Sequence, residues 1–364
     1  MSHLLQRGSS VPLYWQLSEI LLQRIFTGEW QSGDSLPAEP ELCREFGVAR
    51  GTVRQALDRL ENAGYVRRER GRGTFVTREG ERLQGRGAAG SQIGFVVPYV
   101  RDSFVSTILL GVERAAAEQG MSITFKHVDN NVERQADVLE ALVAQQLAGV
   151  VLYPVDSVHA DPAARLIQSG YPLVLVDRYL RGVPSDYVMS DHFGGALRAT
   201  QHLIQLGHRQ IGFISWRDPS ISLEHRAAGY QRAMLEAGLS IDPSFTCEVE
   251  GYPTVSLTPL CALLMEKRCT AIFAANDQIA LAVYQAARQI GRHIPDDLAL
   301  IGFDNLDFTA HLDVPLTTIE QPAFEIGRTA VEALARRIRG KVEGWQQIIL
   351  PTRLVVRRSC GANR

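Results

Sequence analysis

The sequence predicts two domains of different fold class: an α+β winged helix-turn-helix domain at the amino terminus, then an α/β domain of two lobes with parallel sheets. Three observations lead to this prediction. The first eighty residues carry helical spacing of apolar residues and then an arginine-rich hairpin pattern. From Ile93 onward, short apolar runs alternate with helical patterns. At 364 residues with 45% hydrophobic content, the chain is also too long for one small domain.

The first expected helix carries leucine and isoleucine at intervals of three and four between Leu13 and Ile25. This is the spacing of a helix with one buried face. Gly28 is expected to end it. A short second helix is expected from about Glu39 to Phe46, followed by a tight turn at Gly47.

A third helix is expected from about Arg50 to Asn62, where Gly64 stands in a position that favours a helix end. Its apolar residues form one inward stripe, so polar residues stay exposed around its first turns. These residues are Arg50, Thr52, Arg54 and Gln55. In a helix-turn-helix protein, this part of the recognition helix reaches base edges in the major groove.

The wing is expected where residues 65–68 and 74–77 alternate like two strands around a glycine-containing turn. Residues 65–78 hold five arginines and one glutamate, a composition that suits a sugar-phosphate backbone or a minor groove. The hairpin residues expected to contact DNA are Arg70, Arg72, Gly73 and Thr74. Taken singly, these patterns also fit any three-helix bundle or a charged sheet edge. Their order along the chain favours DNA binding.

The order LPxExEL, GVxRxTVRxALxxLExxGYV and GRGTFV closely resembles the N-terminal domain of the GntR family of bacterial transcription regulators over residues 11–77. The resemblance implies a DNA-binding domain at residues 10–77, with the recognition-helix arginines and residues 72–74 among its DNA contacts. The sequence departs from the family at Ala38-Glu39-Pro40, where Ser-Glu-Arg is usual. A helix cap oxygen is therefore missing, at a cost of about 1 kcal/mol. An arginine that typically contacts DNA is missing too.

The net charge, the apolar runs and the cysteines limit where the protein acts and which kinds of binding site it can have. The formal net charge is −2, so attraction to DNA must come from the local placement of arginines. There is no run of eighteen apolar residues and no amino-terminal apolar signal region, which predicts a cytoplasmic protein. The five cysteines are scattered without metal-ligand spacing. We therefore expect no metal site and no cofactor.

Residues 78–91 are rich in glycine and charge and lack apolar periodicity, which is typical of a linker. Beyond them, the apolar runs indicate parallel sheets covered on both faces, and ligands bind such sheets beyond the carboxyl ends of the strands. Polar residues stand at several of these ends, namely Asp177, Asn276, Asp277 and Asp304. Each alone is explained equally well as a helix cap. Together they indicate a pocket that suits sugar hydroxyls. Aromatic residues that could pack on the sugar ring are Phe104, Tyr153, Tyr252 and Phe303.

The segments GVERAAAEQG, LIQLGHRQIGFI, HRAAGYQRAM, AANDQIALAVYQAARQIGRHIPDDLALIGFDN and PLTTIEQP resemble the effector domain of LacI/GalR regulators, which has the fold of periplasmic sugar-binding proteins. The resemblance implies an effector domain at residues 92–360. Its two lobes would be residues 92–189 with 321–350, and residues 190–320 with 351–360. The implied effector contacts are Ser103, Phe104, Tyr153, Asp177, Arg226, Asn276, Asp304 and Gln321. Leu152 takes a place where the family often has a polar contact.

The combination of these two domains resembles the AraR-type arabinose repressors. It implies a sequence-specific DNA-binding transcription regulator, a homodimer that represses carbohydrate-use genes until a small sugar releases it from its operator. A non-sugar effector such as a nucleoside, and corepression or activation, stay open. An enzyme is not expected: GntR-headed chains with an aminotransferase-like domain need a Schiff-base lysine, and none of Lys126, Lys267 and Lys341 lies in a suitable motif. A transport protein would need an export signal.

Overall fold

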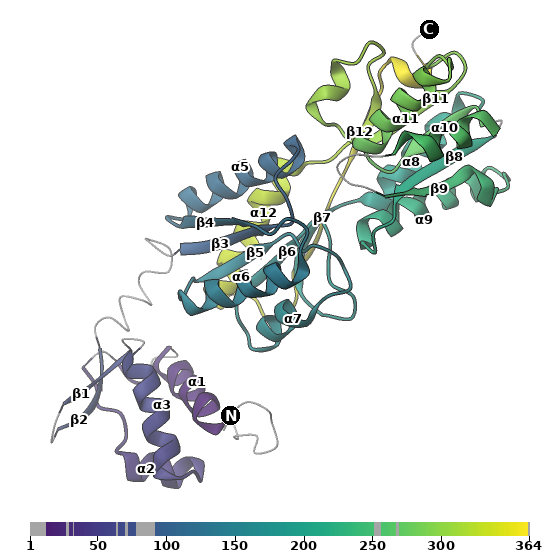
Figure 1. Cartoon of the computed structure of the whole chain (residues 1–364). Coiled ribbons are helices and arrows are strands. Elements are labelled where there is room, and N and C mark those ends of the chain that lie inside the picture. Colours follow the sequence, from purple (N-terminus) through teal and green to yellow (C-terminus); the bar gives the residue numbers. More distant parts are fainter. Residues whose placement is uncertain are drawn as a thin grey trace. The chain divides into compact units, whose positions relative to one another are not determined.

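The computed structural model describes most of the chain, and Figure 1 shows its course. The described residues are 12–26, 29–31, 33–62, 65–69, 72–77, 92–250, 256–266 and 269–362. The chain divides into two compact units, Met1–Ala89 and Gly90–Arg364. Some of the residues considered above lie outside the described residues: Gly28, Gly64, Arg70, the linker 78–91, Tyr252 and Lys267.

The first unit contains helices and a two-stranded antiparallel sheet. Its described elements are α1 (Leu13–Phe26), α2 (Glu39–Phe46), α3 (Arg50–Asn62), β1 (Val66–Glu69) and β2 (Gly73–Val76). One leucine from each helix, Leu17, Leu42 and Leu57, is buried in a common core. The expected bounds of α2 and α3 are confirmed. The turn after α2 closes at Gly47, which has a φ of 62° and donates its N–H to the Cys43 carbonyl, a left-handed helix cap.

The wing strands differ by one residue from the expected 65–68 and 74–77. The observed register sets Val66 opposite Val76 and Glu69 opposite Gly73. The Arg72 N–H donates to the Glu69 carbonyl at 2.9 Å, and Gly73 has a φ of 124°. The strands therefore reach further into the turn than expected, because backbone hydrogen bonds decide where a strand ends, whereas alternation decides only which face a side chain takes.

The start of α2 lacks a side-chain cap, as Ala38 predicted. Glu41 offsets part of the loss, because its Oε2 accepts the Ala38 N–H at 2.9 Å. This contact is one half of a capping box.

The second unit has two lobes, and among the described residues each lobe contains a sheet of six strands (Figure 1). The first lobe contains β3 (Gln92–Val97), α5 (Ser103–Glu118), β4 (Ser122–His127), α6 (Val132–Ala144), β5 (Gly149–Leu152), α7 (Asp161–Gln168), β6 (Leu173–Val176), β7 (Asp186–Ser190), α12 (Ala323–Ile338) and β13 (Gln347–Leu350). The second lobe contains α8 (His192–Gln205), β8 (Ile211–Trp216), α9 (Ile221–Glu236), β9 (Thr246–Val249), α10 (Leu257–Glu266), β10 (Ala271–Ala274), α11 (Asp277–Gln289), β11 (Ala299–Asp304), β12 (Thr317–Glu320) and β14 (Arg353–Val355).

The strand orders are β13-β7-β6-β5-β3-β4 in the first lobe and β14-β12-β11-β10-β8-β9 in the second. Every described pairing in the first sheet is parallel. The second sheet is parallel except at its edge, where β14 runs antiparallel to β12. The expected parallel sheets are therefore confirmed, and the antiparallel edge strand β14 lies outside the apolar runs on which that expectation rested. The chain passes between the lobes at residues 190–192, 320–323 and 350–353.

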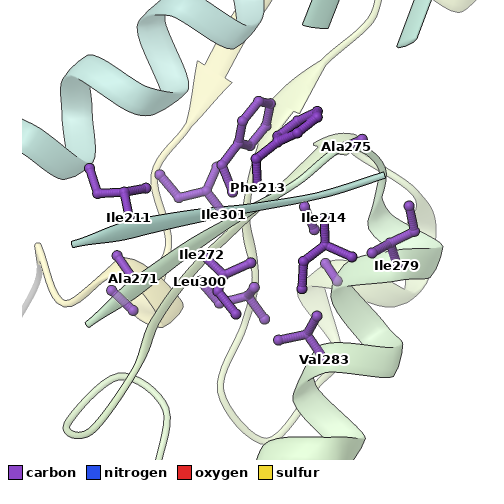
Figure 2. Close-up of a cluster of buried hydrophobic side chains, with 14 of the residues drawn as sticks. Ile211, Phe213, Ile214, Ala271, Ile272, Ala275, Ile279, Val283, Leu300 and Ile301 are labelled. Atoms are coloured by element: carbon purple, nitrogen blue, oxygen red, sulfur yellow. The ribbon is translucent and has the colours of Figure 1, made fainter. Parts of the chain in front are cut away.

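The strands are buried on both faces, as continuous apolar runs predict. In β3, Phe95 packs in one apolar cluster with residues of α5 and α12, and its neighbour Val96 packs in another with residues of α6 and α7. Figure 2 shows the corresponding core of the second lobe, where Ile211, Ile272 and Ile301 come from three neighbouring strands. This packing holds the carboxyl ends of the strands at one edge of each sheet.

Glycines let paired helices approach closely. A Cβ added at Gly327 in α12 would lie 2.1 Å from the Ile108 carbonyl oxygen of α5, and a Cβ at Gly111 would lie 2.0 Å from the Phe324 carbonyl oxygen. The two helix backbones are therefore in direct contact. In the part of the chain that the structure describes, no helix is long and apolar enough to cross a membrane.

Gly327→Ala should destabilise the second unit by about 1–3 kcal/mol, because the methyl group forces two packed helices apart. Gly344→Ala is the matched control, since a Cβ at Gly344 meets nothing within 4 Å. Urea unfolding of both variants and the wild type measures the effect. Equal stability of Gly327→Ala and wild type would contradict the close packing.

Candidate functional site

Two arginines of the recognition helix α3 share one carboxylate. The side chains of Arg50 and Arg54 are 64% and 56% exposed, and their Nε atoms donate to Glu39 at 2.9 and 3.1 Å. The hydrogen bond from Arg50 lowers the pKa of Glu39 below its ordinary value, against the effect of partial burial. An ionised Glu39 thus orients both guanidinium groups at the first turns of α3. Thr52 is half-buried and Gln55 is exposed on the same turns.

Glu69 has a similar place in the wing. Arg67 and Arg72 donate to its carboxylate at 2.5 and 2.6 Å, and Arg72 stays 74% exposed. Gly73 is exposed and Thr74 is half-buried. The wing therefore presents arginines whose positions are set by an acidic neighbour.

Arg68 joins the wing to the recognition helix. Its guanidinium pairs with Asp58 of α3 and donates to the Arg54 carbonyl at 3.1 Å. Strand β1 and α3 are thus held together by a side chain that the sequence analysis did not single out.

The second unit has a small cavity between its lobes, at the carboxyl ends of both sheets. The residues that line it are Tyr99, Asp102, Phe104, Tyr153, Asp177, Arg178, Trp216, Ser220, Ser222, Leu223, Arg226, Asn276, Asp304 and Gln321. All of the expected effector contacts are among them except Ser103. That residue lines an adjoining cavity of about 410 Å³, which also includes Phe104 and Asp304 in its wall.

Arg226 is a buried cation in the wall of the cavity. Its Nη1 donates to the Ala275 carbonyl at 2.6 Å and lies 3.4 Å from Asp304 Oδ1. The guanidinium carbon lies 3.8 Å from the centre of the Phe303 ring. Phe303 is fully buried beneath Arg226, so its expected role of packing on a ligand is wrong. Strand β11 places the Phe303 ring in the core, where the ring stabilises the Arg226 guanidinium.

His192 holds the other edge of Arg226. Arg226 Nε donates to His192 Nδ1 at 3.3 Å, and His192 Nε2 lies 3.1 Å from the Asp177 carbonyl oxygen. Burial, with a further contribution from the Arg226 charge, lowers the pKa of His192 from 6.5 to about 3. The imidazole is therefore neutral, and these contacts assign its proton to Nε2.

Arg178 provides a second buried cation from the first lobe. It donates to the Val155 carbonyl at 2.8 Å and to the Tyr153 hydroxyl at 3.3 Å. Its guanidinium also lies 3.7 Å from Asp177 and from Asp218, the latter in the second lobe. Burial raises the pKa of Tyr153 well above its ordinary value, so its hydroxyl stays neutral.

The polar residues at the strand ends have different roles. Gln321 Nε2 donates to Asp304 Oδ1 at 2.7 Å, and burial raises the pKa of Asp304 against the effect of Arg226. Asn276 lines the cavity and also caps α11, accepting the Ile279 N–H at 2.9 Å. The helix cap is thus confirmed, and the effector contact expected of Asn276 stays a prediction that its place in the cavity wall permits.

Asp277 does not line the cavity, so the expectation that it faces the pocket is wrong. It is fully buried and accepts hydrogen bonds from the Leu306 N–H at 2.8 Å and the Thr318 hydroxyl at 2.7 Å. These contacts join the start of α11 to the loop after β11 and to β12. Leu152, where a polar contact is usual, is fully buried in the core.

Buried atoms of cavity-lining side chains that have no hydrogen-bond partner among the described residues include Asp177 Oδ1, Gln321 Oε1 and Arg178 Nε. Leaving such groups unpaired costs free energy, so the cavity is suited to a ligand that supplies donors and an acceptor together. A hydroxyl group supplies both. Within the described ranges, no group of three or more His, Cys, Asp and Glu side chains could hold a metal ion.

Sequence reasoning missed Arg178, His192 and Trp216. Arg178 directly follows Asp177 after β6, and Trp216 ends β8, so the strand-end rule that found Asp177 could have found both. His192 gives no sequence signal, because a single histidine without spaced partner residues matches no ligand motif. Its role as a neutral support for Arg226 depends on contacts between distant segments.

The pKa of His192 makes acid stability a test of this geometry. The unfolded chain takes up a proton near pH 6.5, whereas folded His192 does so only near pH 3, so its contribution to stability falls as the pH drops below about 6.5. The free energy of unfolding of wild type should therefore decrease more steeply between pH 7 and 4 than that of His192→Gln. Other titrating groups are common to both proteins. Parallel pH profiles in urea unfolding would contradict this, because they would show that His192 takes up its proton at the same pH in the folded and the unfolded chain.

Two family models match the chain. The model of the bacterial regulatory proteins of the gntR family matches residues 13–76, and that of the periplasmic binding protein-like domain matches residues 200–360. Over 97% of this chain and 99% of the relative, the sequence is 31% identical to the arabinose metabolism transcriptional repressor of Geobacillus stearothermophilus. It is 30% identical to the ribose operon repressor of Haemophilus influenzae over 73% of this chain and 80% of the relative.

Solved structures show the same fold in the second unit. A LacI family transcriptional regulator from Enterococcus faecium with bound ribose has a TM-score of 0.64 and 27% identity, over 75% of this chain and 100% of that one. The complex of the transcriptional regulator CelR with cellobiose has a TM-score of 0.69 and 26% identity, over 89% of this chain and 100% of that one. The curated relatives are transcriptional repressors and not enzymes, as the sequence predicted. The chain therefore belongs to the family of transcriptional repressors that join a gntR-family DNA-binding domain to a periplasmic-binding-protein-like effector domain, the family of the arabinose metabolism repressors.

Proposed function

We propose that this chain represses genes for carbohydrate use and is released from its operator by a small neutral sugar bound between the two lobes. The observation that carries the proposal is the set of buried, unpaired polar atoms on Asp177, Arg178 and Gln321. A sugar presents several hydroxyl groups on one rigid ring, so it can pair with all three at once.

The charge balance of the cavity favours a neutral ligand. Two buried guanidinium groups, Arg178 and Arg226, lie close to two carboxyl groups, Asp177 and Asp304. A phosphate would have to compete with these carboxylates for the arginines. Tyr153 and Phe104 supply apolar surface, with ring centres 6.5 Å apart in an edge-on arrangement, which suits the C–H face of a sugar ring. The names of the relatives, for arabinose and ribose, agree with such a ligand.

The first unit would read the operator. In the proposed complex Arg50, Thr52, Arg54 and Gln55 enter the major groove, and the wing contacts the backbone or the minor groove. The wing residues with this role are Arg70, Arg72, Gly73 and Thr74. Arginines that are already oriented by Glu39 lose less conformational freedom when they bind base edges.

The proposal includes a homodimer that acts in the cytoplasm. Two winged domains in a twofold dimer match two operator half-sites at a fixed spacing. Sugar binding that closes the lobes changes the distance between the two linker attachment points, near residue 92 of each copy. The heads then no longer fit both half-sites, which lowers operator affinity by a coupling of about 1–3 kcal/mol.

The test is fluorescence anisotropy of operator DNA with the purified protein at fixed salt, repeated across pentoses, hexoses, sugar phosphates and nucleosides. A neutral sugar that weakens the complex about fivefold or more supports the proposal. Release by a nucleoside or a sugar phosphate alone would replace the proposed ligand class. A sugar that tightens the complex would make the ligand a corepressor.

Arg54→Ala should weaken operator binding by about 1–3 kcal/mol and relax discrimination at one base pair, because an arginine at this position can donate two hydrogen bonds to a guanine. Anisotropy titrations with the operator and single-base variants measure both effects. The matched control is Arg232→Ala, an exposed arginine of α9 that pairs with Glu236. Affinity unchanged from wild type would remove Arg54 from the reading surface.

Arg226→Ala should abolish the response to the sugar while operator binding persists. Removal of this cation leaves Asp304 without its ion-pair partner in a buried site, at a cost of about 3–5 kcal/mol, and removes donors for the ligand. Calorimetric titration with the sugar and anisotropy with the operator separate the two functions. Arg232→Ala, on the same helix, should respond like wild type. If the sugar still releases Arg226→Ala from the operator, the cavity is not the effector site.

A further inference from the structure

Helix α9 carries Arg226, and its first turn faces the cavity through Ser222 and Leu223. The residue at its N-cap position, Ser220, makes no side-chain cap hydrogen bond to the described residues of the helix. Its hydroxyl lies instead 3.3 Å from the Ser222 hydroxyl. The helix that holds the central arginine therefore begins without a cap of its own.

The missing cap comes from the other lobe. Ser157, in the loop after β5, accepts the N–H of Ile221 on its Oγ at 3.0 Å. Ser157 is fully buried and Ile221 is nearly so, so water does not replace this bond while the lobes are together. An oxygen that satisfies a free amide at a helix start typically contributes about 1 kcal/mol.

The loop that presents Ser157 is held in one conformation. Asp156 Oδ1 accepts the N–H groups of Val158 and His159, both at 2.8 Å. The Ser157 carbonyl accepts the Arg181 N–H at 2.9 Å, which ties this loop to the one after β6. The hydroxyl of Ser157 is thus positioned by its own lobe before it meets α9.

Further contacts join the loop after β6 to the first turns of α9. Arg181 forms an ion pair with Glu224. The ring of Tyr179 lies 6.2 Å from the ring of His225, measured between their centres. Residues of the first lobe thus hold the first turns of α9.

We propose that Ser157 and Arg181 form an inter-lobe clasp with Ile221 and Glu224, and that this clasp holds α9, and through it Arg226, on the bound effector. Ser157 is a positioning residue: it lies outside the cavity wall and acts through the helix. The clasp closes only when the lobes come together, so it lengthens the time that the effector stays bound. The inference rests on the proposed function for the identity of the effector, but the cap itself does not depend on it.

The test uses full-length Ser157→Ala with Ser169→Ala as the matched control. Among the described residues, the Ser169 hydroxyl bonds within its own lobe, to the Leu166 carbonyl. Hydrogen exchange over residues 217–226 should become about fivefold faster in Ser157→Ala. Stopped-flow tryptophan fluorescence with the releasing sugar should show an off-rate raised about fivefold and an unchanged on-rate. Operator affinity without sugar should equal that of wild type.

A charge exchange tests the second contact of the clasp. Arg181→Glu should raise the sugar off-rate about two- to fivefold, as for an exposed ion pair, and Arg181→Glu with Glu224→Arg should restore it. Unchanged exchange and an unchanged off-rate in Ser157→Ala would overturn the clasp. If no sugar binds wild type, the proposed function fails, and exchange over residues 217–226 alone decides whether Ser157 caps α9.

Discussion

The buried guanidinium of Arg226 is the interaction on which the effector domain depends. A buried cation is tolerated only when its donors and its charge are matched, and Arg226 finds its partners on separate segments: the Ala275 carbonyl after β10, Asp304 at the end of β11, and His192 at the start of α8. Strand β11 also supplies the Phe303 ring beneath it. This one side chain therefore fixes the relative positions of the elements that form the second lobe's half of the cavity. Other polar atoms of the cavity do not pair with Arg226 and stay available for a ligand.

The DNA-binding unit uses the same principle under a weaker constraint. Glu39 and Glu69 each orient two arginines, but these pairs are largely exposed. Exposed ion pairs contribute little to folding, so they can open when DNA phosphates or bases compete for the arginines. Buried pairing in the effector domain thus gives a rigid site, and exposed pairing in the head gives side chains that are oriented and still available. Glu39 orients these arginines in a chain that has Pro40 where the family usually has an arginine.

The sequence predicts the features that depend on local signals, and it misses those that depend on contacts between distant segments of the chain. The bounds of α2 and α3 were predictable because glycine turns and apolar spacing are local signals. The strand-end rule located Asp177, Asn276 and Asp304 because topology alone brings carboxyl ends of parallel strands together. It failed for Asp277, which bonds to Thr318 across the sheet, and for Phe303, which turns into the core. His192 escaped notice because a neutral histidine that supports an arginine has no sequence pattern.

The proposed release of operator by a sugar requires effector and operator to act on one shared equilibrium of this repressor. Thermodynamic linkage then requires the coupling to be reciprocal. The direct measurement is calorimetric titration of the releasing sugar into the protein alone and into the protein saturated with operator DNA. Operator should weaken sugar binding by the same factor by which sugar weakens operator binding. Equal sugar affinity in both titrations would contradict it, because the cavity would then have no influence on the DNA-binding unit.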